Sequence, residues 1–157
     1  MHPTDGFTLA GPVANRGLNI APPPLPVGRQ RHRFGEGPFA RLVMPDLPAK
    51  PGLYLWQQDE KVVYVGETRM PLRKRLGSNG YATISGYNTL AREAGRTNGG
   101  QQTNCRVNAL ANVALVGGHT IRIWYRVTDA AEARVEEAAW MRTFGLPAWN
   151  RRIEGIA

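Results

Sequence analysis

The chain has 157 residues, of which 42% are apolar, and it carries a single cysteine and a formal net charge of +8. This length suits one domain with one core, and no apolar run approaches the ~20 residues that a membrane span requires. The lone Cys105 excludes an internal disulfide and argues against a cysteine-based zinc site. With no secretory-signal pattern at the N-terminus, we expect a cytoplasmic protein without a membrane partner.

The charge gives the first indication of a partner. Lys and Arg number 20 against 12 Asp and Glu, and 17 of the 20 are arginine. The planar guanidinium pairs with phosphate through two hydrogen bonds and also stacks on bases. The composition therefore indicates a nucleic-acid partner.

The N-terminal part of the chain is rich in proline. Most of the 12 prolines precede residue 51, and neither a helical nor a strand period is visible there. We expect residues 1–33 to form an extended or disordered arm and residues 34–157 to form the folded domain. Arg29, Arg31 and Arg33 would then either contact phosphates or lie in a solvated tail.

Two apolar runs, Leu53–Trp56 and Val62–Val65, predict a β-hairpin. If residue 57 pairs with residue 61 across a three-residue loop, Tyr54 lies directly opposite Tyr64. Both phenol rings then share one face of the sheet. This interpretation depends on the register, because a slip of one residue would separate the rings.

A short basic helix and a long loop follow the hairpin. Pro71 fits the first turn of a helix that carries Arg73, Lys74 and Arg75. The segment 77–102 then alternates small polar residues with aromatic residues and arginines. Such a mixture suits base stacking and phosphate contact, and it also suits a solvent-exposed insertion.

The remaining chain predicts a helix over Cys105–Val116, a strand over His119–Thr128 and a helix over Ala130–Phe144. Thr103 or Asn104 would cap the first of these helices. The strand face that carries arginine and tryptophan either meets nucleic acid or packs under another element. In the last helix, Glu137 falls within the apolar stripe, where a carboxylate is costly unless a cation, a metal or hydrogen bonds accompany it.

Several of these residues occur at a characteristic spacing. Gly52-Leu53-Tyr54, nine residues, Tyr64-Val65-Gly66 and then Leu72-x-x-Arg75-Leu76 resemble the GIY-YIG nuclease superfamily, which includes homing endonucleases, excision-repair nucleases and some restriction enzymes. The patterns Glu132-Ala133-x-x-x-Glu137 and Pro147-x-x-Asn150 resemble the repair members. The resemblance covers about residues 51–76 and 129–150. It implies a small α/β (α+β) domain with a three-stranded antiparallel sheet flanked by helices.

The resemblance also implies a metal-dependent DNA endonuclease that hydrolyses phosphodiester bonds, similar to restriction or mobile-element enzymes. Glu137 would hold one Mg²⁺ or Mn²⁺, and Arg75 would neutralise charge on the phosphoryl group. Tyr54 and Tyr64 would position the attacking water, and Asn150 would orient groups near the metal or the phosphate. The residues expected to contact nucleic acid are Arg69, Arg73, Lys74, Tyr81, Arg92 and Arg96.

The pattern is not complete. Glu67 stands where repair members often carry a lysine. Relative to those members, one residue is added between Gly66 and Leu72 and another between Glu137 and Asn150. These differences leave open which tyrosine acts as the general base. Two other functions remain open: a nucleic-acid-binding module that keeps the fold without the chemistry, and a protein-interaction domain that uses the proline-rich arm. A homodimer is expected if both DNA strands are cut.

Overall fold

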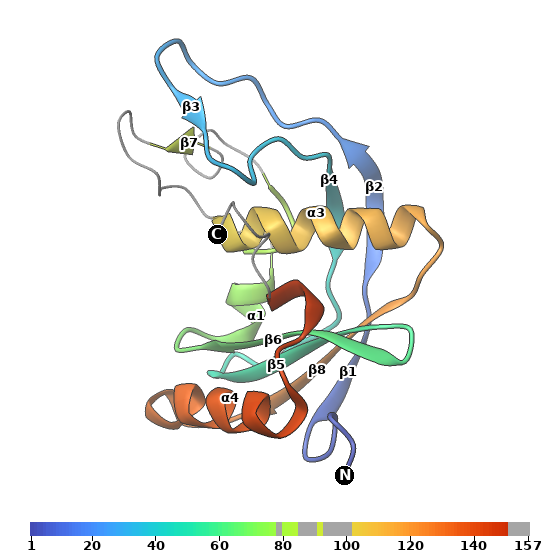
Figure 1. Cartoon of the computed structure of the whole chain (residues 1–157), viewed down its shortest axis with the longest axis vertical. Coiled ribbons are helices and arrows are strands. Elements are labelled where there is room, and N and C mark those ends of the chain that lie inside the picture. The colour runs from blue at the N-terminus through green and yellow to red at the C-terminus, as the bar shows by residue number, and fades with distance from the viewer. Residues whose placement is uncertain (78–79, 85–90, 93–101, 151–157) are drawn as a thin grey trace.

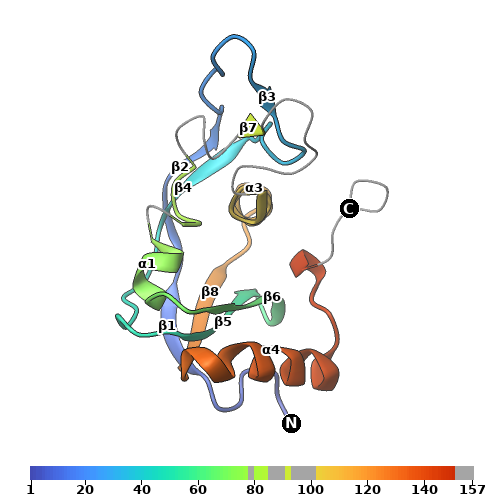
Figure 2. The same cartoon turned by 90° about the vertical axis from the view of Figure 1, so that its left-hand side faces the viewer.

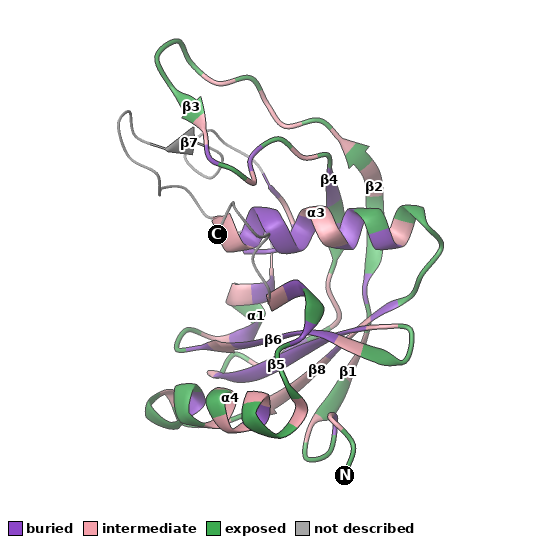
Figure 3. Ribbon diagram, in the orientation of Figure 1, coloured by how far each residue is buried: buried purple, intermediate pink, exposed green. Residues whose placement is uncertain are grey.

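A four-stranded antiparallel sheet organises the computed structural model, which describes residues 1–77, 80–84, 91–92 and 102–150 (Figure 1). The strands lie in the order β1, β8, β5, β6. β1 (Thr8–Pro12) and β6 (Lys61–Thr68) form the edges, and β8 (Ile121–Val127) and β5 (Gly52–Gln58) lie between them. All but the last residue of β5 is buried, so this strand runs through the middle of the core (Figure 3).

The mixed α and β class is confirmed, but the prediction of three strands was wrong. The fourth strand is β1, which pairs antiparallel with β8 and places Thr8 opposite Tyr125. Its sequence, TLAGP, has no apolar alternation, and its register shifts between Leu9 and Gly11. Pro12 has no N–H to donate, which an edge strand tolerates. Backbone pairing builds this strand, so the side-chain pattern gave no sign of it.

The hairpin of β5 and β6 pairs two residues away from the predicted register. Tyr54 lies opposite Gly66, and Tyr64 lies opposite Trp56. Because the shift is even, the two tyrosines still share a face, but they are diagonal neighbours rather than a direct pair. The Tyr54 ring lies over Gly66, where an added Cβ would overlap it. A glycine is therefore required at this position.

The hairpin turn accounts for one residue of the shift, and a bulge between Trp56 and Gln57 accounts for the other. Gln58 pairs with Lys61, so the loop has two residues rather than three. Asp59 adopts a φ of +53°, and its N–H donates to the Thr120 carbonyl at 2.9 Å. Its carboxylate accepts hydrogen bonds from the Thr120 N–H and hydroxyl at 3.1 and 3.2 Å. These contacts with the residue just before β8 favour the tighter turn.

The first 33 residues are extended but are not a free or disordered arm. β1 joins the main sheet, β2 (Ala14–Ile20) pairs with β4 (Phe39–Val43), and β3 (Gln30–Arg31) pairs with β7 (Ala91–Arg92). Irregular chain, which includes the proline-rich run, joins β2 to β3. This part of the chain therefore contributes strands to three separate sheets.

Helices cover both faces of the main sheet (Figure 2). α4 (Ala130–Phe144) packs through Trp140 on the face of Leu55 and Val65. α1 (Leu72–Leu76) and α3 (Gln102–Val116) lie on the other face, which carries the tyrosines. α4 begins and ends as predicted, and its Asp129 cap accepts from the Ala131 N–H at 2.8 Å. None of the described helices combines the length and apolar character needed to cross a bilayer.

Buried asparagines attach α3 to the β2–β4 pair. The Asn108 amide accepts from the Ala40 N–H at 2.8 Å and donates to the Ala40 carbonyl at 2.9 Å. One turn later, Asn112 accepts from the Asn19 N–H at 2.8 Å. α3 starts at Gln102, so the predicted caps Thr103 and Asn104 lie inside it. Asn104 is buried there, and its side chain contacts the site described below.

Candidate active site

Three tyrosines meet at one point on the α1 and α3 side of the sheet, and we call Tyr54, Tyr64 and Tyr81 the tyrosine cluster. A hydrogen bond of 2.8 Å joins the hydroxyls of Tyr54 and Tyr81, and the Tyr81 hydroxyl donates to that of Tyr64 at 3.4 Å. The ring centroids lie 6.0 to 6.2 Å apart in every pair. The rings come from β5, from β6 and from the segment after α1, so the fold brings together parts of the chain that are separate in sequence.

Arg75, in the last turn of α1, joins the cluster. Its guanidinium donates to the Tyr81 hydroxyl at 2.9 Å and to Asn104 Oδ1 at 2.6 Å. Its Cζ atom also lies 4.2 Å from the centroid of the Tyr81 ring. These contacts fix a positive charge beside three hydroxyls, which is a suitable arrangement for neutralising an oxyanion.

All three phenols remain protonated at neutral pH. Burial raises the pKa of Tyr54, and the neighbouring Tyr64 adds to the effect. Burial raises the pKa of Tyr64 as well, followed by the influence of Tyr81, and burial likewise raises that of Tyr81. The charge of Arg75 opposes each shift without reversing it. The cluster therefore supplies hydrogen-bond donors, and a phenol in it becomes a base only if a further cation lowers its pKa.

Tyr81, which we expected to contact nucleic acid, lies inside the protein. Its side chain is 0% exposed and lies in the middle of the cluster. In the sequence, Tyr81 stands out only as an aromatic residue close after Arg75, in a segment of polar composition. Trp56, which contacts the Tyr81 ring with centroids 5.4 Å apart, completes its burial.

Two carboxylates lie on the α4 side of the sheet, opposite the face that carries the cluster, and we call Glu67 and Glu137 the carboxylate pair. Burial raises the pKa of Glu137, and the charge of Glu67 raises it further, while Arg134 opposes both. The negative charge of Glu137 also acts on Tyr54, which places the pair within electrostatic reach of the cluster. The neighbouring Glu136 instead lies 3.8 Å from Arg126. Glu137 is therefore the carboxylate that α4 directs toward this region.

The carboxylate pair fits a hard divalent cation. Glu67 follows Gly66 on β6, and its Oε2 is buried without a hydrogen-bond partner. Two carboxylates that raise each other's energy gain from a shared cation with oxygen preference, such as Mg²⁺ or Mn²⁺. Within the described ranges, no group of three or more His, Cys, Asp or Glu gathers at one place. An ion held by this pair would therefore keep most of its water ligands.

Asn150 is used differently from its predicted role. Its Oδ1 accepts from the Val65 N–H at 2.9 Å, and its Nδ2 donates to the Val65 carbonyl at 2.8 Å. The amide thus pairs with the free edge of β6 as a further strand would. It fixes the short helix η1 (Ala148–Asn150), whose Trp149 ring packs 6.0 Å from that of Trp56. Asn150 therefore positions the edge strand through both polar atoms of its side-chain amide.

The expected nucleic-acid contacts are partly described. Arg69, Arg73 and Lys74 are exposed at and just before α1, and Arg73 Nε donates to the Leu47 carbonyl at 2.9 Å. Arg92 lies in β7, and its side chain is outside the described residues, as is the whole of Arg96. Three exposed cations therefore flank the half-buried Arg75.

Two further candidates have structural roles. The arginine and tryptophan face of β8 packs against other parts of the protein, because Arg126 lies over the Phe7 ring at 4.7 Å and Trp124 donates to Gln57 Oε1 at 2.8 Å. Cys105 is fully buried, and burial raises the pKa of its thiol to about 12. Neither is placed to react with a substrate.

Comparison of the chain with models of protein families, with curated proteins and with solved structures gives no match.

Proposed function

We propose that this protein is a metal-dependent DNA endonuclease that hydrolyses phosphodiester bonds with a site of GIY-YIG type. The observation that supports this most strongly is the convergence of Tyr54, Tyr64 and Arg75 on one face of the sheet. Glu137 lies on the α4 side of the sheet, and its charge is the smallest of the causes that raise or lower the pKa of Tyr54. These four residues come from four separate elements. A core that served only stability would not need the Arg75 guanidinium or the Glu137 carboxylate, because burying a charged group is costly.

Each residue has a role that follows from its surroundings. Glu137, with Glu67 beside it, would hold the cation. Arg75 would transfer its hydrogen bonds from Tyr81 and Asn104 to phosphate oxygens, because charge-assisted bonds to phosphate are stronger than those to neutral oxygens. A bound Mg²⁺ or Mn²⁺ would polarise the phosphate and stabilise the leaving oxygen.

Tyr64 is the tyrosine best suited to contact the attacking water. It is 7% exposed, whereas Tyr54 is 1% exposed and Tyr81 is fully buried. Its protonated hydroxyl would orient that water as a hydrogen-bond donor. Tyr54 would hold the cluster together behind it. Arg69, Arg73 and Lys74 would contact the DNA backbone beside the cut.

The test compares the protein with its Glu137→Gln and Glu132→Gln variants on supercoiled plasmid and phage DNA, with Mg²⁺ or Mn²⁺ and with EDTA. Glu132 is the matched control because it is exposed on the same helix. We expect cleavage that needs the metal, falls about 100-fold or more in Glu137→Gln and is unchanged in Glu132→Gln. Cleavage that persists in EDTA, or equal cleavage by Glu137→Gln, would overturn the proposal.

One observation favours a non-catalytic nucleic-acid-binding module as the second candidate. Arg75 and the phenol hydroxyls already satisfy one another inside the fold. A protein that only binds DNA through its exposed cations would keep this closed arrangement. Salt-dependent DNA binding by the wild type, with no cleavage of paired, nicked or branched DNA in any metal, would support this candidate.

A further inference from the structure

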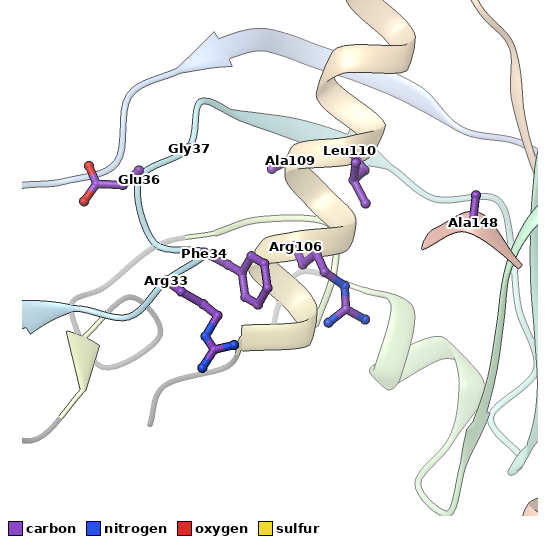
Figure 4. Close-up of a pocket in the computed structure, with 8 residues that line it drawn as sticks. All are labelled: Arg33, Phe34, Glu36, Gly37, Arg106, Ala109, Leu110 and Ala148. Atoms are coloured by element: carbon purple, nitrogen blue, oxygen red, sulfur yellow. The ribbon is translucent and has the colours of Figure 1, made fainter. Parts of the chain in front are cut away.

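A pocket of about 280 Å³ lies between the turn that precedes β4, α3 and η1 (Figure 4). Phe34, Ala109, Leu110 and Ala148 give it apolar walls, and Arg33 and Arg106 add two cations. Its volume lies just below the range of about 300–1,000 Å³ in which drug-sized ligands bind. The pocket therefore suits one small ligand with an apolar body and negative charge nearby.

The side chains favour a flat ligand. The Arg106 guanidinium lies over the Phe34 ring, with Cζ 5.5 Å from the centroid. In Figure 4, Arg106 is on the side of the ring toward η1, and Arg33 is on the other side. Glu36 also lines the pocket, and its carboxylate points away from the Phe34 ring in the same view. An aromatic ring with flanking guanidinium groups is a combination on which nucleobases stack.

The pocket and the proposed cleavage site both use side chains of α3. Arg106 lines the pocket, and Asn104 accepts a hydrogen bond from Arg75. The positive charge of Arg106 reaches Tyr64 and favours its ionised form, although burial outweighs this effect. A phosphate bound at Arg75 and a base bound at Phe34 would therefore lie on the same short stretch of a DNA strand.

We propose that this pocket binds one unpaired nucleobase of the substrate strand, which makes DNA with an unpaired nucleotide the preferred substrate. The inference rests on the proposed function for the adjoining phosphate site. A base in a duplex is stacked and paired, so it reaches a pocket lined by Phe34 and Leu110 only after it leaves the stack. A mismatched, bulged or single-stranded base needs less energy to do so, and this difference would select the substrate.

The test measures binding in EDTA, where no metal-dependent cleavage occurs. The probes are short duplexes that are fully paired, that carry one unpaired 2-aminopurine or that carry an abasic site at the same place. We expect the unpaired base to bind about tenfold tighter than the other two, because stacking contributes that order of affinity. The 2-aminopurine emission should fall on binding as the base stacks on Phe34.

Two variants connect this preference with the pocket. Phe34→Leu keeps an apolar side chain but removes the ring, and we expect the preference to fall to about twofold or less with paired-duplex binding unchanged. Arg16→Gln, at an exposed arginine on β2, is the control and should retain the preference. Free dAMP should compete only weakly, because it lacks the neighbouring phosphates of a strand.

The outcomes separate this inference from the proposed function. A preference that Phe34→Leu removes supports the pocket even if no metal induces cleavage. Equal binding of all three probes by the wild type, a preference that survives in Phe34→Leu, or competition by free dAMP at the affinity of the strand would overturn it. If DNA does not bind at all, both proposals are wrong.

Discussion

The tyrosine cluster and the carboxylate pair both bury polar groups, and they do so in opposite ways. In the cluster, neutral hydroxyls bond to one another and to Arg75, so few hydrogen-bonding groups are left unused. In the pair, two like charges lie together, and the buried Oε2 of Glu67 has no partner. The cluster should therefore stabilise the fold, and the pair should destabilise it until a cation binds.

The largest expected effect comes from alkaline pH. Burial raises the folded-state pKa of each cluster tyrosine above its ordinary value of 10.0. Above pH 10 the unfolded chain loses these protons while the folded chain keeps them, so stability falls as pH rises. Three such groups lower the free energy of unfolding by about 4 kcal/mol per pH unit. Urea unfolding from pH 9 to pH 11 measures this slope, and a flat profile would contradict it.

Removal of the Tyr81 hydroxyl should have the next largest effect. Tyr81→Phe leaves the Tyr54 and Tyr64 hydroxyls and one Arg75 nitrogen without this partner. We expect the free energy of unfolding to fall by about 1–3 kcal/mol, because buried polar groups lose their hydrogen bonds. Urea denaturation measures the loss. A neutral effect would mean that the cluster does not stabilise the fold through these bonds.

Asn150→Ala should have a smaller effect on stability. The variant removes two hydrogen bonds to the β6 edge that are only partly buried, so we expect a loss of about 1–2 kcal/mol. Amide hydrogen exchange should also become faster at Val65, whose N–H loses its acceptor. Unchanged exchange together with lost DNA cleavage would instead favour the catalytic role that the sequence suggested.

Glu137→Gln should have the smallest effect, and it should stabilise the protein. The folded-state pKa of Glu137 is raised, so wild-type stability falls as pH rises from the unfolded value through the folded one. The Gln side chain does not ionise, so the variant does not lose stability as the pH rises. Solvent screens the half-buried carboxylate, so in EDTA we expect a gain of only about 2 °C in melting temperature near pH 8 and no gain near pH 4.

In excess Mg²⁺, the wild type should have a higher melting temperature than Glu137→Gln, the reverse of the order expected in EDTA. A cation that binds the folded wild type raises its melting temperature by mass action, whereas Glu137→Gln lacks one ligand. Thermal unfolding at several Mg²⁺ concentrations measures this. Equal stabilisation of both proteins would show that the cation binds elsewhere.

Regular side-chain patterns made part of the fold predictable. The alternation in residues 121–127 and the stripe in Ala130–Phe144 gave β8 and α4, because burial on one face leaves a period in the sequence. β1 and β2 leave no such period. Their pairing depends on backbone hydrogen bonds and irregular registers, which the side chains do not record.

The candidate site was predictable where it lies within the hairpin and α1. Tyr54, Tyr64 and Arg75 occupy adjoining elements, so local geometry brings them together even after the register error. Tyr81 was expected only as a nucleic-acid contact and Glu67 only as a departure from the motif, because the position of each in the site depends on tertiary contact. Tyr81 enters the core from a loop. Glu67 becomes part of a carboxylate pair only through Glu137 on α4, which is about 70 residues later in the sequence.

The pairing of the first strand also determines when the protein is complete. Thr8 pairs with Tyr125, and the Pro3 carbonyl accepts from the Trp140 indole at 2.9 Å. Contacts between such distant residues form slowly, and during synthesis the N-terminal residues leave the ribosome long before their partners. The hairpin and α1 can fold early, whereas the edge strand must wait for β8 and α4. Because Glu137 also arrives with α4, the proposed site would be complete only after α4 has been synthesised.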